Sequence, residues 1–273
     1  MRIGIKDPTH LGDSMCLSSV FRLLRSMYPE HTFGLYQRKP YHEDIYPGNI
    51  IPVMTSCDAY ICPSYTGHTY TLCELLADNV ACQVNALLKG NKEYDVLGLV
   101  PELEISEDDL KQYSYLGDYV LIVPASPDRG PHKNYPYLQE IIDSRPDINF
   151  AVVGHSYDKI KKLKNVYDMV GNTSVKQSLI LVARAKHIIS YSGALVHASA
   201  AFGTPCTVIL GCSDRWNYTN YPNVTQILSS CSCGYTWMNP CSRRLCPDSH
   251  IIDDIPYPDC ISRINPHIIA QYI

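Results

Sequence analysis

The amino-acid sequence predicts an α/β protein with two Rossmann-like domains whose parallel sheets face a central cleft. Short apolar segments alternate with amphipathic helical segments along most of the 273 residues, which is typical of parallel sheets with right-handed crossovers. The alternation stops in an acidic stretch without a clear strand, residues 100–117, and then begins again. We therefore expect an N-terminal domain at 1–115 and a C-terminal domain at 116–273. With 45% hydrophobic and 18% charged residues, the chain can bury a normal core.

In the first half, residues 3–6 are expected to form a strand, and residues 14–27 an amphipathic helix that Asp13 or Ser14 can cap. Further strands are expected at 32–36, 50–54 and 59–62, and a further helix at 70–88.

In the second half, the expected strands are 119–123, 148–153, 187–190 and 206–210. The expected helices are 137–144, 156–163, 175–185, 193–202 and one from about residue 266. Ligands bind at the carboxyl ends of the strands in open α/β sheets. The loops at 7–13 and 125–134 and the turn at 191–193 are therefore expected to border the cleft.

The strongest candidate site lies at residues 191–205. The chain leaves a strand, turns at Ser192 and Gly193, and enters a helix of small residues. A helix N-terminus presents free N–H groups and a partial positive charge, which suit a diphosphate. Gly193 lets a phosphate approach the backbone closely, and His197 follows about one turn later. A tightly packed helix with a core histidine is an equally good interpretation of the composition alone.

Residues 192–205 resemble the donor-site signature of the heptosyltransferase family, glycosyltransferase family 9, which is Asp-Ser-Gly-x-x-His-x-x-Ala-Ala-x-Gly-x-Pro. The matching residues are Ser192-Gly193-Ala194-Leu195-Val196-His197-Ala198-Ser199-Ala200-Ala201-Phe202-Gly203-Thr204-Pro205. Three further segments are similar to the family in the same order: Leu11-Gly12-Asp13, Lys133-Asn134-Tyr135-Pro136 (the family's Lys-x-Trp-Pro loop) and Val152-Val153-Gly154. The match covers most of the chain and is more specific than any single motif.

The resemblance implies a GT-B fold and sugar transfer with inversion at the anomeric carbon, without a metal. Asp13 matches the proposed general base, which takes the proton of the acceptor hydroxyl; a helix N-cap is the alternative. Lys133 matches a lysine that offsets charge on the leaving diphosphate; a solvated loop lysine is the alternative. The implied donor-binding residues are Lys133, Tyr191, Ser192, Gly193, Ala194 and His197. The implied acceptor-side residues are Gly12, Arg22 and Arg25, although such arginines are also typical of a solvated surface.

One departure from the family pattern concerns Tyr191, which stands where the family has an aspartate that contacts the donor. A tyrosine there can stack on a base or a sugar, or simply pack. The donor's identity, and with it the inference of an ADP-sugar, is therefore open.

A cysteine-rich segment lies near the C-terminus. Its members are Cys231, Cys233, Cys241, Cys246 and Cys260. Only some of their spacings suit zinc, which prefers two to four residues between paired ligands. We expect a local structural staple, formed by zinc or by packed thiols, and no cofactor for catalysis.

The bulk composition limits the possible functions. A net charge of −4 and a pI near 6.2 give no broad basic surface for nucleic acid. The N-terminus lacks the apolar segment of a signal peptide, so we expect a cytoplasmic protein, with a peripheral location at the inner membrane face as one form of this expectation. The leading hypothesis is a glycosyltransferase that acts on a surface glycan or a lipopolysaccharide core. The alternatives are an epimerase or hydrolase on the same fold, and a non-catalytic nucleotide-sugar-binding protein.

Overall fold

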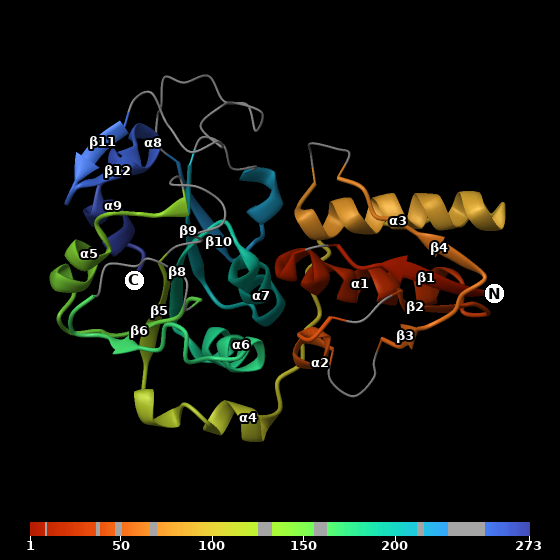
Figure 1. Cartoon of the computed structure of the whole chain (residues 1–273), viewed down its shortest axis with the longest axis horizontal. Coiled ribbons are helices and arrows are strands. Elements are labelled where there is room, and N and C mark those ends of the chain that lie inside the picture. The colour runs from red at the N-terminus through yellow and green to blue at the C-terminus, as the bar shows by residue number, and fades with distance from the viewer. Residues whose placement is uncertain are drawn as a thin grey trace. The chain divides into compact units, whose positions relative to one another are not determined.

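The computed structural model describes residues 1–8, 10–36, 39–46, 51–65, 70–124, 133–155, 163–211, 216–228 and 249–273. They form two compact units, Met1–Glu104 and Ile105–Ile273 (Figure 1). The division falls before residue 115 because α4 (Glu107–Lys111) packs on the second unit. Lys176 pairs with Asp109 at 2.8 Å, and the Arg184 guanidinium donates a hydrogen bond to the Leu110 carbonyl oxygen.

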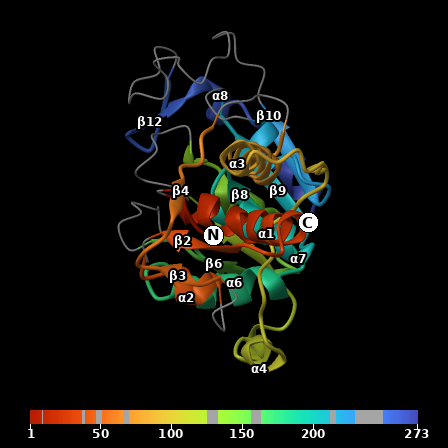
Figure 2. The same cartoon turned by 90° about the vertical axis from the view of Figure 1, so that its right-hand side faces the viewer.

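The first unit is an open parallel sheet with two long helices packed together. Its elements are β1 (Arg2–Lys6), α1 (Leu11–Met27), β2 (Thr32–Tyr36), α2 (His42–Ile45), β3 (Val53–Met54), β4 (Ala59–Ile61) and α3 (Leu72–Leu88). The strand order is β3-β2-β1-β4, and each pairing is parallel. α1 and α3 lie side by side in Figures 1 and 2 and contact each other along their length. Asp7 directly follows β1, a central strand of this sheet. It lies beside the first turn of α1, where Ser14 Oγ donates a hydrogen bond to it.

Helix α1 begins earlier than the sequence pattern indicates. Its N-cap is His10, whose side chain makes no capping hydrogen bond, and Asp13 lies inside the first turn. The expectation that Asp13 or Ser14 caps this helix is therefore wrong. A carboxylate in the first turn is still favourable, because it lies at the positive end of the helix dipole.

The second unit contains a wider parallel sheet. Its elements are α4, a 3-10 turn at Ser114–Leu116, β5 (Tyr119–Val123), α5 (Leu138–Ser144), β6 (Asn149–Val152), β7 (Tyr167–Asp168), α6 (Val175–Arg184), β8 (His187–Tyr191), α7 (Ala194–Phe202), β9 (Cys206–Leu210), a 3-10 turn at Trp216–Thr219, β10 (Val224–Leu228), β11 (Ser249–Ile252), β12 (Ile255–Pro258), α8 (Asp259–Ser262) and α9 (Pro266–Ala270). The order of the main sheet is β10-β9-β8-β5-β6-β7. The helix expected at 156–163 lies, apart from its last residue, outside the described residues.

The centre of this sheet is buried on both faces. Strands β5 and β9 are buried along their whole length, as expected for central strands of a parallel sheet. The small side chains of Ala198 and Ala200 are buried and let α7 pack closely on β8 and β9. The predicted α/β fold with parallel sheets is therefore confirmed in both units.

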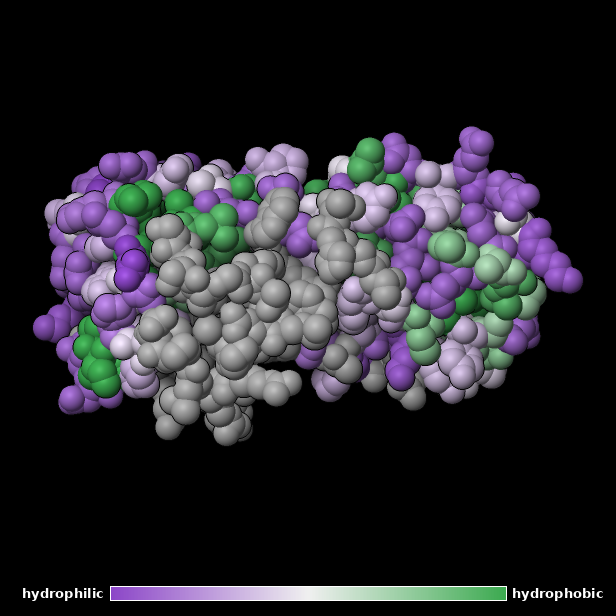
Figure 3. Space-filling model, turned by 90° about the horizontal axis from the view of Figure 1, so that it is seen from above, coloured by the Kyte–Doolittle hydropathy of each residue, from purple (hydrophilic) through white to green (hydrophobic). Residues whose placement is uncertain are grey.

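The described helices include none that is both long enough and apolar enough to cross a membrane. In the view of Figure 3, hydrophilic residues cover most of the described surface, and hydrophobic side chains lie in separate small groups.

Candidate functional site

The residues that were expected to carry chemistry lie in two groups, one in each unit. In the first unit, Asp13 lies in the first turn of α1, beyond the carboxyl end of β1. In the second unit, Lys133, residues 191–194 and His197 lie near the carboxyl ends of β5 and β8. Both are places where open parallel sheets bind ligands.

Asp13 is a nearly buried carboxylate, 8% exposed. The Tyr65 hydroxyl donates a hydrogen bond of 2.5 Å to Asp13 Oδ2. Tyr65 follows β4 in a loop that is fixed to α3, because both the N–H and the hydroxyl of Ser64 bond to the Asn79 side chain. This carboxylate is therefore held in one orientation, as a proton acceptor for a hydroxyl group would need to be.

A second acid, Asp7, lies at the centre of a buried polar cluster beside the same turn. Its side chain is 2% exposed and pairs with Lys39 Nζ at 2.9 Å. It also accepts hydrogen bonds from Ser14 Oγ at 2.5 Å and from His42 Nε2 at 2.8 Å. The backbone N–H of Lys39 donates to His42 Nδ1, so the ring proton lies on Nε2 and points to Asp7. The cluster therefore consists of one anion, one cation and neutral donors.

The members of this cluster stabilise each other's charges. Burial alone would raise the pKa of Asp7, but the hydrogen bonds from His42, Ser14 and Lys39 outweigh it and hold that pKa below its usual value. Burial alone would lower the pKa of Lys39, but the hydrogen bonds to Asp7 and Tyr41 and the charge of Asp7 together outweigh it and raise that pKa. The Tyr46 hydroxyl donates to the Ser14 carbonyl oxygen. Ser14, the neighbour of Asp13, is thus held through both its side chain and its backbone.

The residues expected on the acceptor side are not all brought together. Gly12 is buried in the first turn of α1 beside Asp13. Arg22 lies about 13 Å further along α1, on the opposite side of the helix, and its guanidinium pairs with Glu102. Arg25 is exposed in the last turn. The cation that the structure places at the Asp13 end of α1 is Lys39, which the sequence did not single out as a site residue.

In the second unit, Lys133 reaches the turn between β8 and α7. Its ammonium donates a hydrogen bond of 2.5 Å to the Ser192 carbonyl oxygen. The same Nζ lies 5.7 Å from the centre of the Tyr191 ring, within the range of a cation–π interaction. Lys133, Tyr191 and Ser192 are therefore brought together at the turn from β8 into α7.

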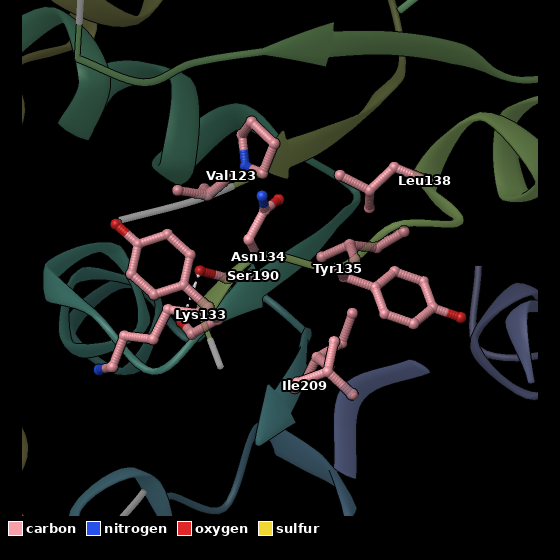
Figure 4. A pocket seen from close by; sticks show the side chains of 11 residues that line it. Val123, Lys133, Asn134, Tyr135, Leu138, Ser190 and Ile209 are labelled. Atoms are coloured by element: carbon pink, nitrogen blue, oxygen red, sulfur yellow. Dashed lines mark hydrogen bonds between the residues drawn. The ribbon is translucent and has the colours of Figure 1, made fainter. Parts of the chain in front are cut away.

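A pocket lies beside this contact, at the carboxyl ends of β5, β8 and β9. Figure 4 shows the side chains of Asn134 and Ser190 in it together with apolar Val123, Leu138 and Ile209. A few polar groups and apolar walls line this pocket, but its free space is only about that of one water molecule, so by itself it is too small for a nucleotide.

Gly193 is the N-cap of α7, with φ −162° and ψ −174°. This extended conformation is open to any residue, so close approach is what requires the glycine. A Cβ atom on Gly193 would lie 2.6 Å from Tyr191 Cε2. No side chain caps α7, and Ala194 in its first turn is half-buried.

His197 is buried and neutral. Its Nδ1 lies 2.8 Å from the Tyr221 hydroxyl, and the two rings meet edge to face. Burial, together with the nearby charge of Lys133, lowers the pKa of His197 to about 4. The contact between Nδ1 and Tyr221 favours the interpretation of His197 as a core histidine.

The start of α7 departs from the family pattern in its spacing as well. The pattern has two residues between its glycine and its histidine, and this chain has three, Ala194, Leu195 and Val196. One extra residue turns a side chain by about 100° around a helix. The roles of Gly193 and His197 therefore cannot both be transferred from the signature by position alone.

The cysteine-rich segment falls mostly outside the described residues, which include Cys260 but not Cys231, Cys233, Cys241 or Cys246. Cys260 is buried in α8 and packs in the core of the second unit. Within the described part of the chain, no three His, Cys, Asp or Glu side chains gather closely enough to hold a metal ion. The zinc expectation stays a prediction.

Solved structures place this fold among known proteins, although no protein-family model and no curated protein matches the chain. The glycosyl transferase family 9 structure from Veillonella parvula matches with a TM-score of 0.70 and 15% identity, over 99% of this chain and 95% of that one. ADP-heptose lipopolysaccharide heptosyltransferase II of E. coli matches with a TM-score of 0.63 and 14% identity, over 100% and 97%. TibC, an iron-containing dodecameric glycosyltransferase of enterotoxigenic E. coli, gives a TM-score of 0.63 and 14% identity, over 85% and 63%.

The chain therefore has the heptosyltransferase-like GT-B fold, which confirms the fold that the sequence resemblance implied. Identities of 14 to 15% establish the fold, and the activity has to be argued from the site.

Sequence reasoning missed four residues that shape the first unit's site: Asp7, Lys39, His42 and Tyr65. They come from separate segments of the chain, and Tyr65 lies 52 positions from the carboxylate that it contacts. The one available signal was Asp7, an acid directly after a buried strand, a position where side chains often meet ligands.

Proposed function

We propose that this protein is an inverting glycosyltransferase. It would move a sugar, heptose or a similar one, from a nucleoside-diphosphate sugar to a surface glycan or a lipopolysaccharide-core-type acceptor, with an ADP-sugar as the favoured donor. The observation that carries the proposal is the place of Lys133 in a GT-B fold: its ammonium lies at the turn from β8 into α7.

The second unit would hold the donor. The Lys133 ammonium would offset the negative charge that develops on the diphosphate as the bond to the sugar breaks. The N–H groups at the start of α7, next to Gly193, are suited to phosphate oxygens. His197, neutral near pH 7 because its pKa is about 4, would add a hydrogen-bonding group without adding charge. The choice of a nucleoside-diphosphate sugar as the donor is supported by the fold neighbour ADP-heptose lipopolysaccharide heptosyltransferase II.

The first unit would provide the base and bind the acceptor. Asp13 would take the proton from the acceptor hydroxyl as that oxygen attacks the anomeric carbon from the face opposite the diphosphate, so that the configuration inverts. The Asp7 cluster holds the adjacent Ser14 in place. Gly12, in the first turn of α1 with Asp13, would lie on the acceptor side, together with Lys39, whose ammonium pairs with Asp7 beside that turn. Arg22, which pairs with Glu102, and Arg25, in the last turn of α1, lie further along the helix and would meet only a long acceptor.

We further propose that the reaction needs no metal and takes place in the cytoplasm. The second unit's described site offers lysine and backbone N–H groups for the leaving diphosphate, which can replace a divalent cation in that role. The iron of TibC is stated for that protein and is not carried over.

The first test is calorimetric titration of the purified full chain, without added metal, with ADP-, UDP-, GDP- and CDP-sugars and the free nucleotides. One nucleotide class should bind, and at a hundredfold excess over its Kd it should stabilise the folded chain by about 2.7 kcal/mol. Lys133→Met should weaken that binding, whereas Lys111→Met, an exposed lysine of α4, serves as the matched control. A chain that binds none of these ligands would refute the donor site.

A second candidate function is a nucleotide-sugar-binding protein with a different reaction or none, such as an epimerase or a hydrolase. It is favoured by Tyr191, which replaces the family aspartate, and by the extra residue between Gly193 and His197. Incubation with the donor that binds, followed by mass spectrometry and NMR of the sugar, separates the cases. Free sugar or an epimer in place of a glycosylated acceptor would favour this second function.

A further inference from the structure

Lys133 is already engaged by its own chain. Its ammonium donates to the Ser192 carbonyl oxygen at 2.5 Å and lies 5.7 Å from the centre of the Tyr191 ring. A cation at this distance is attracted to the face of an aromatic ring. The positive charge that a diphosphate would meet is therefore held between a carbonyl oxygen and a ring.

The Tyr191 ring lies beside Gly193 at the end of a central strand. Tyr191 ends β8, which is paired with β5 on one side and with β9 on the other, where Tyr191 lies in register with Ile209. Its ring lies so close to Gly193 that a Cβ atom there would come within 2.6 Å of Cε2. The strand therefore fixes the backbone of Tyr191, and the absence of a side chain at Gly193 leaves room for the ring at the place where it faces the Lys133 ammonium.

We propose that Tyr191 is a positioning residue, which restrains Lys133 until a diphosphate displaces the ammonium from the ring and from the Ser192 carbonyl oxygen. The inference rests on the proposed function, because it takes Lys133 as the lysine that meets the donor's diphosphate. A diphosphate offers several charge-assisted hydrogen bonds to the ammonium, which are stronger than the contacts that it displaces. Tyr191 thus lowers the affinity for any anion that has to displace the ammonium.

The test is calorimetric titration of the full chain with inorganic pyrophosphate and with orthophosphate. Tyr191→Leu removes the aromatic face, so it should tighten the binding of both anions by about threefold, because each has to displace the ammonium from the ring. Tyr191→Phe keeps the face and should tighten binding less than Tyr191→Leu does. Tyr167→Leu, at a partly exposed tyrosine of β7, is the matched control and should leave binding as it is.

Coupling between the two residues is measured in the Lys133→Met background. There Tyr191→Leu should have no further effect on the Kd for pyrophosphate, because the restrained cation is gone. If pyrophosphate binds to Tyr191→Leu and does not bind to the wild type, the restraint is confirmed, because Tyr191 then keeps the ammonium from the anion completely. If the wild type binds pyrophosphate and Tyr191→Leu binds it equally or more weakly, the restraint is overturned while the donor site stands. If neither protein binds pyrophosphate or any nucleotide, the donor site and the restraint fail together.

Discussion

Two carboxylates near the first turn of α1 have different surroundings and, we expect, different roles. Asp13 accepts a hydrogen bond from a partly exposed tyrosine, Tyr65. Asp7 is enclosed by Ser14, His42 and Lys39 and is fully paired. A carboxylate that is saturated with donors is a poor proton acceptor, so Asp13 is the better candidate for the base.

Asp13→Asn is expected to lower sugar transfer by at least a hundredfold, because an amide cannot accept the proton of the acceptor hydroxyl. Donor affinity should change little, since the donor residues lie in the other unit. The measurement is transfer of radiolabelled sugar, from the donor found by titration, to a panel of lipopolysaccharide-core acceptors. Asp108→Asn, at an exposed acid of α4, is the control. An undiminished rate in Asp13→Asn would remove Asp13 from the mechanism.

Asp7→Asn is expected to destabilise the first unit by about 2 kcal/mol, because it removes a buried charge that accepts hydrogen bonds and pairs with Lys39. Urea unfolding at pH 7 measures the loss, again with Asp108→Asn as the control. If Asp7→Asn unfolds at the wild-type urea concentration, the cluster does not hold the first turn of α1.

One buried histidine, His197, and one half-buried histidine, His187, predict how the stability of the fold depends on pH. Burial lowers the pKa of His187 to about 4, and burial with the charge of Lys133 does the same for His197. Below pH 6.5 the unfolded chain takes up protons at these rings while the folded chain does not, so stability is lost as the pH falls from 6.5 toward 4.

When the pH falls from 7 to 5, we expect each of these histidines to lower the free energy of unfolding by about 2 kcal/mol. Unfolding by urea at both pH values, for the wild type and for His187→Gln, measures the effect. His187→Gln should lose less stability on acidification, whereas His267→Gln, at an exposed position of α9, should behave like the wild type. An equal loss in all three proteins would contradict the assignment.

At the scale of elements, the two ends of α7 depend on glycine for different reasons. Gly193 at the N-terminal end is required by the close Tyr191 ring, and Gly203 at the C-terminal end has φ +68°, which favours glycine. The first reason concerns the candidate site and the second concerns only the helix.

Gly193→Ala is therefore expected to displace the Tyr191 ring and change the affinity for ADP or pyrophosphate by several-fold. Gly203→Ala should cost about 1 kcal/mol of stability and leave that affinity unaltered. Calorimetric titration together with urea unfolding of both variants separates the two effects. Equal affinities in Gly193→Ala and the wild type would show that the ring does not border the anion site.

At the scale of the whole molecule, we expect a chelator to leave the reaction unaffected. After dialysis against EDTA, donor binding and transfer should keep their wild-type values, because Lys133 and backbone N–H groups meet the diphosphate. Thermal unfolding and elemental analysis of the same samples test the separate expectation of a structural zinc at the cysteine-rich segment. A lower melting temperature with unchanged donor binding would indicate a structural metal. Lost donor binding that Mg²⁺ restores would contradict a metal-independent reaction.

The predicted elements agree with the structure where the apolar residues within a segment are enough to define it. The apolar strands at 119–123 and 206–210 were expected from the sequence and coincide with β5 and β9. The start of α1 was misplaced, because residues 11–13 contain few apolar side chains. Its extra turn contains Asp13, whose carboxylate accepts a hydrogen bond from the distant Tyr65, a contact that no local pattern encodes.

The amino-acid sequence by itself determined the α/β class, the alternation of strands and helices, and the likeness of residues 192–205 to a donor-site signature, because these depend on the order and spacing of residues. Only the tertiary structure decided that His42, Lys39 and Tyr65 surround the first turn of α1 and that Tyr191 lies under the Lys133 ammonium. These contacts join residues that are far apart in the chain. They form because parallel strands bring their carboxyl ends to one edge of a sheet, where loops of unrelated sequence meet.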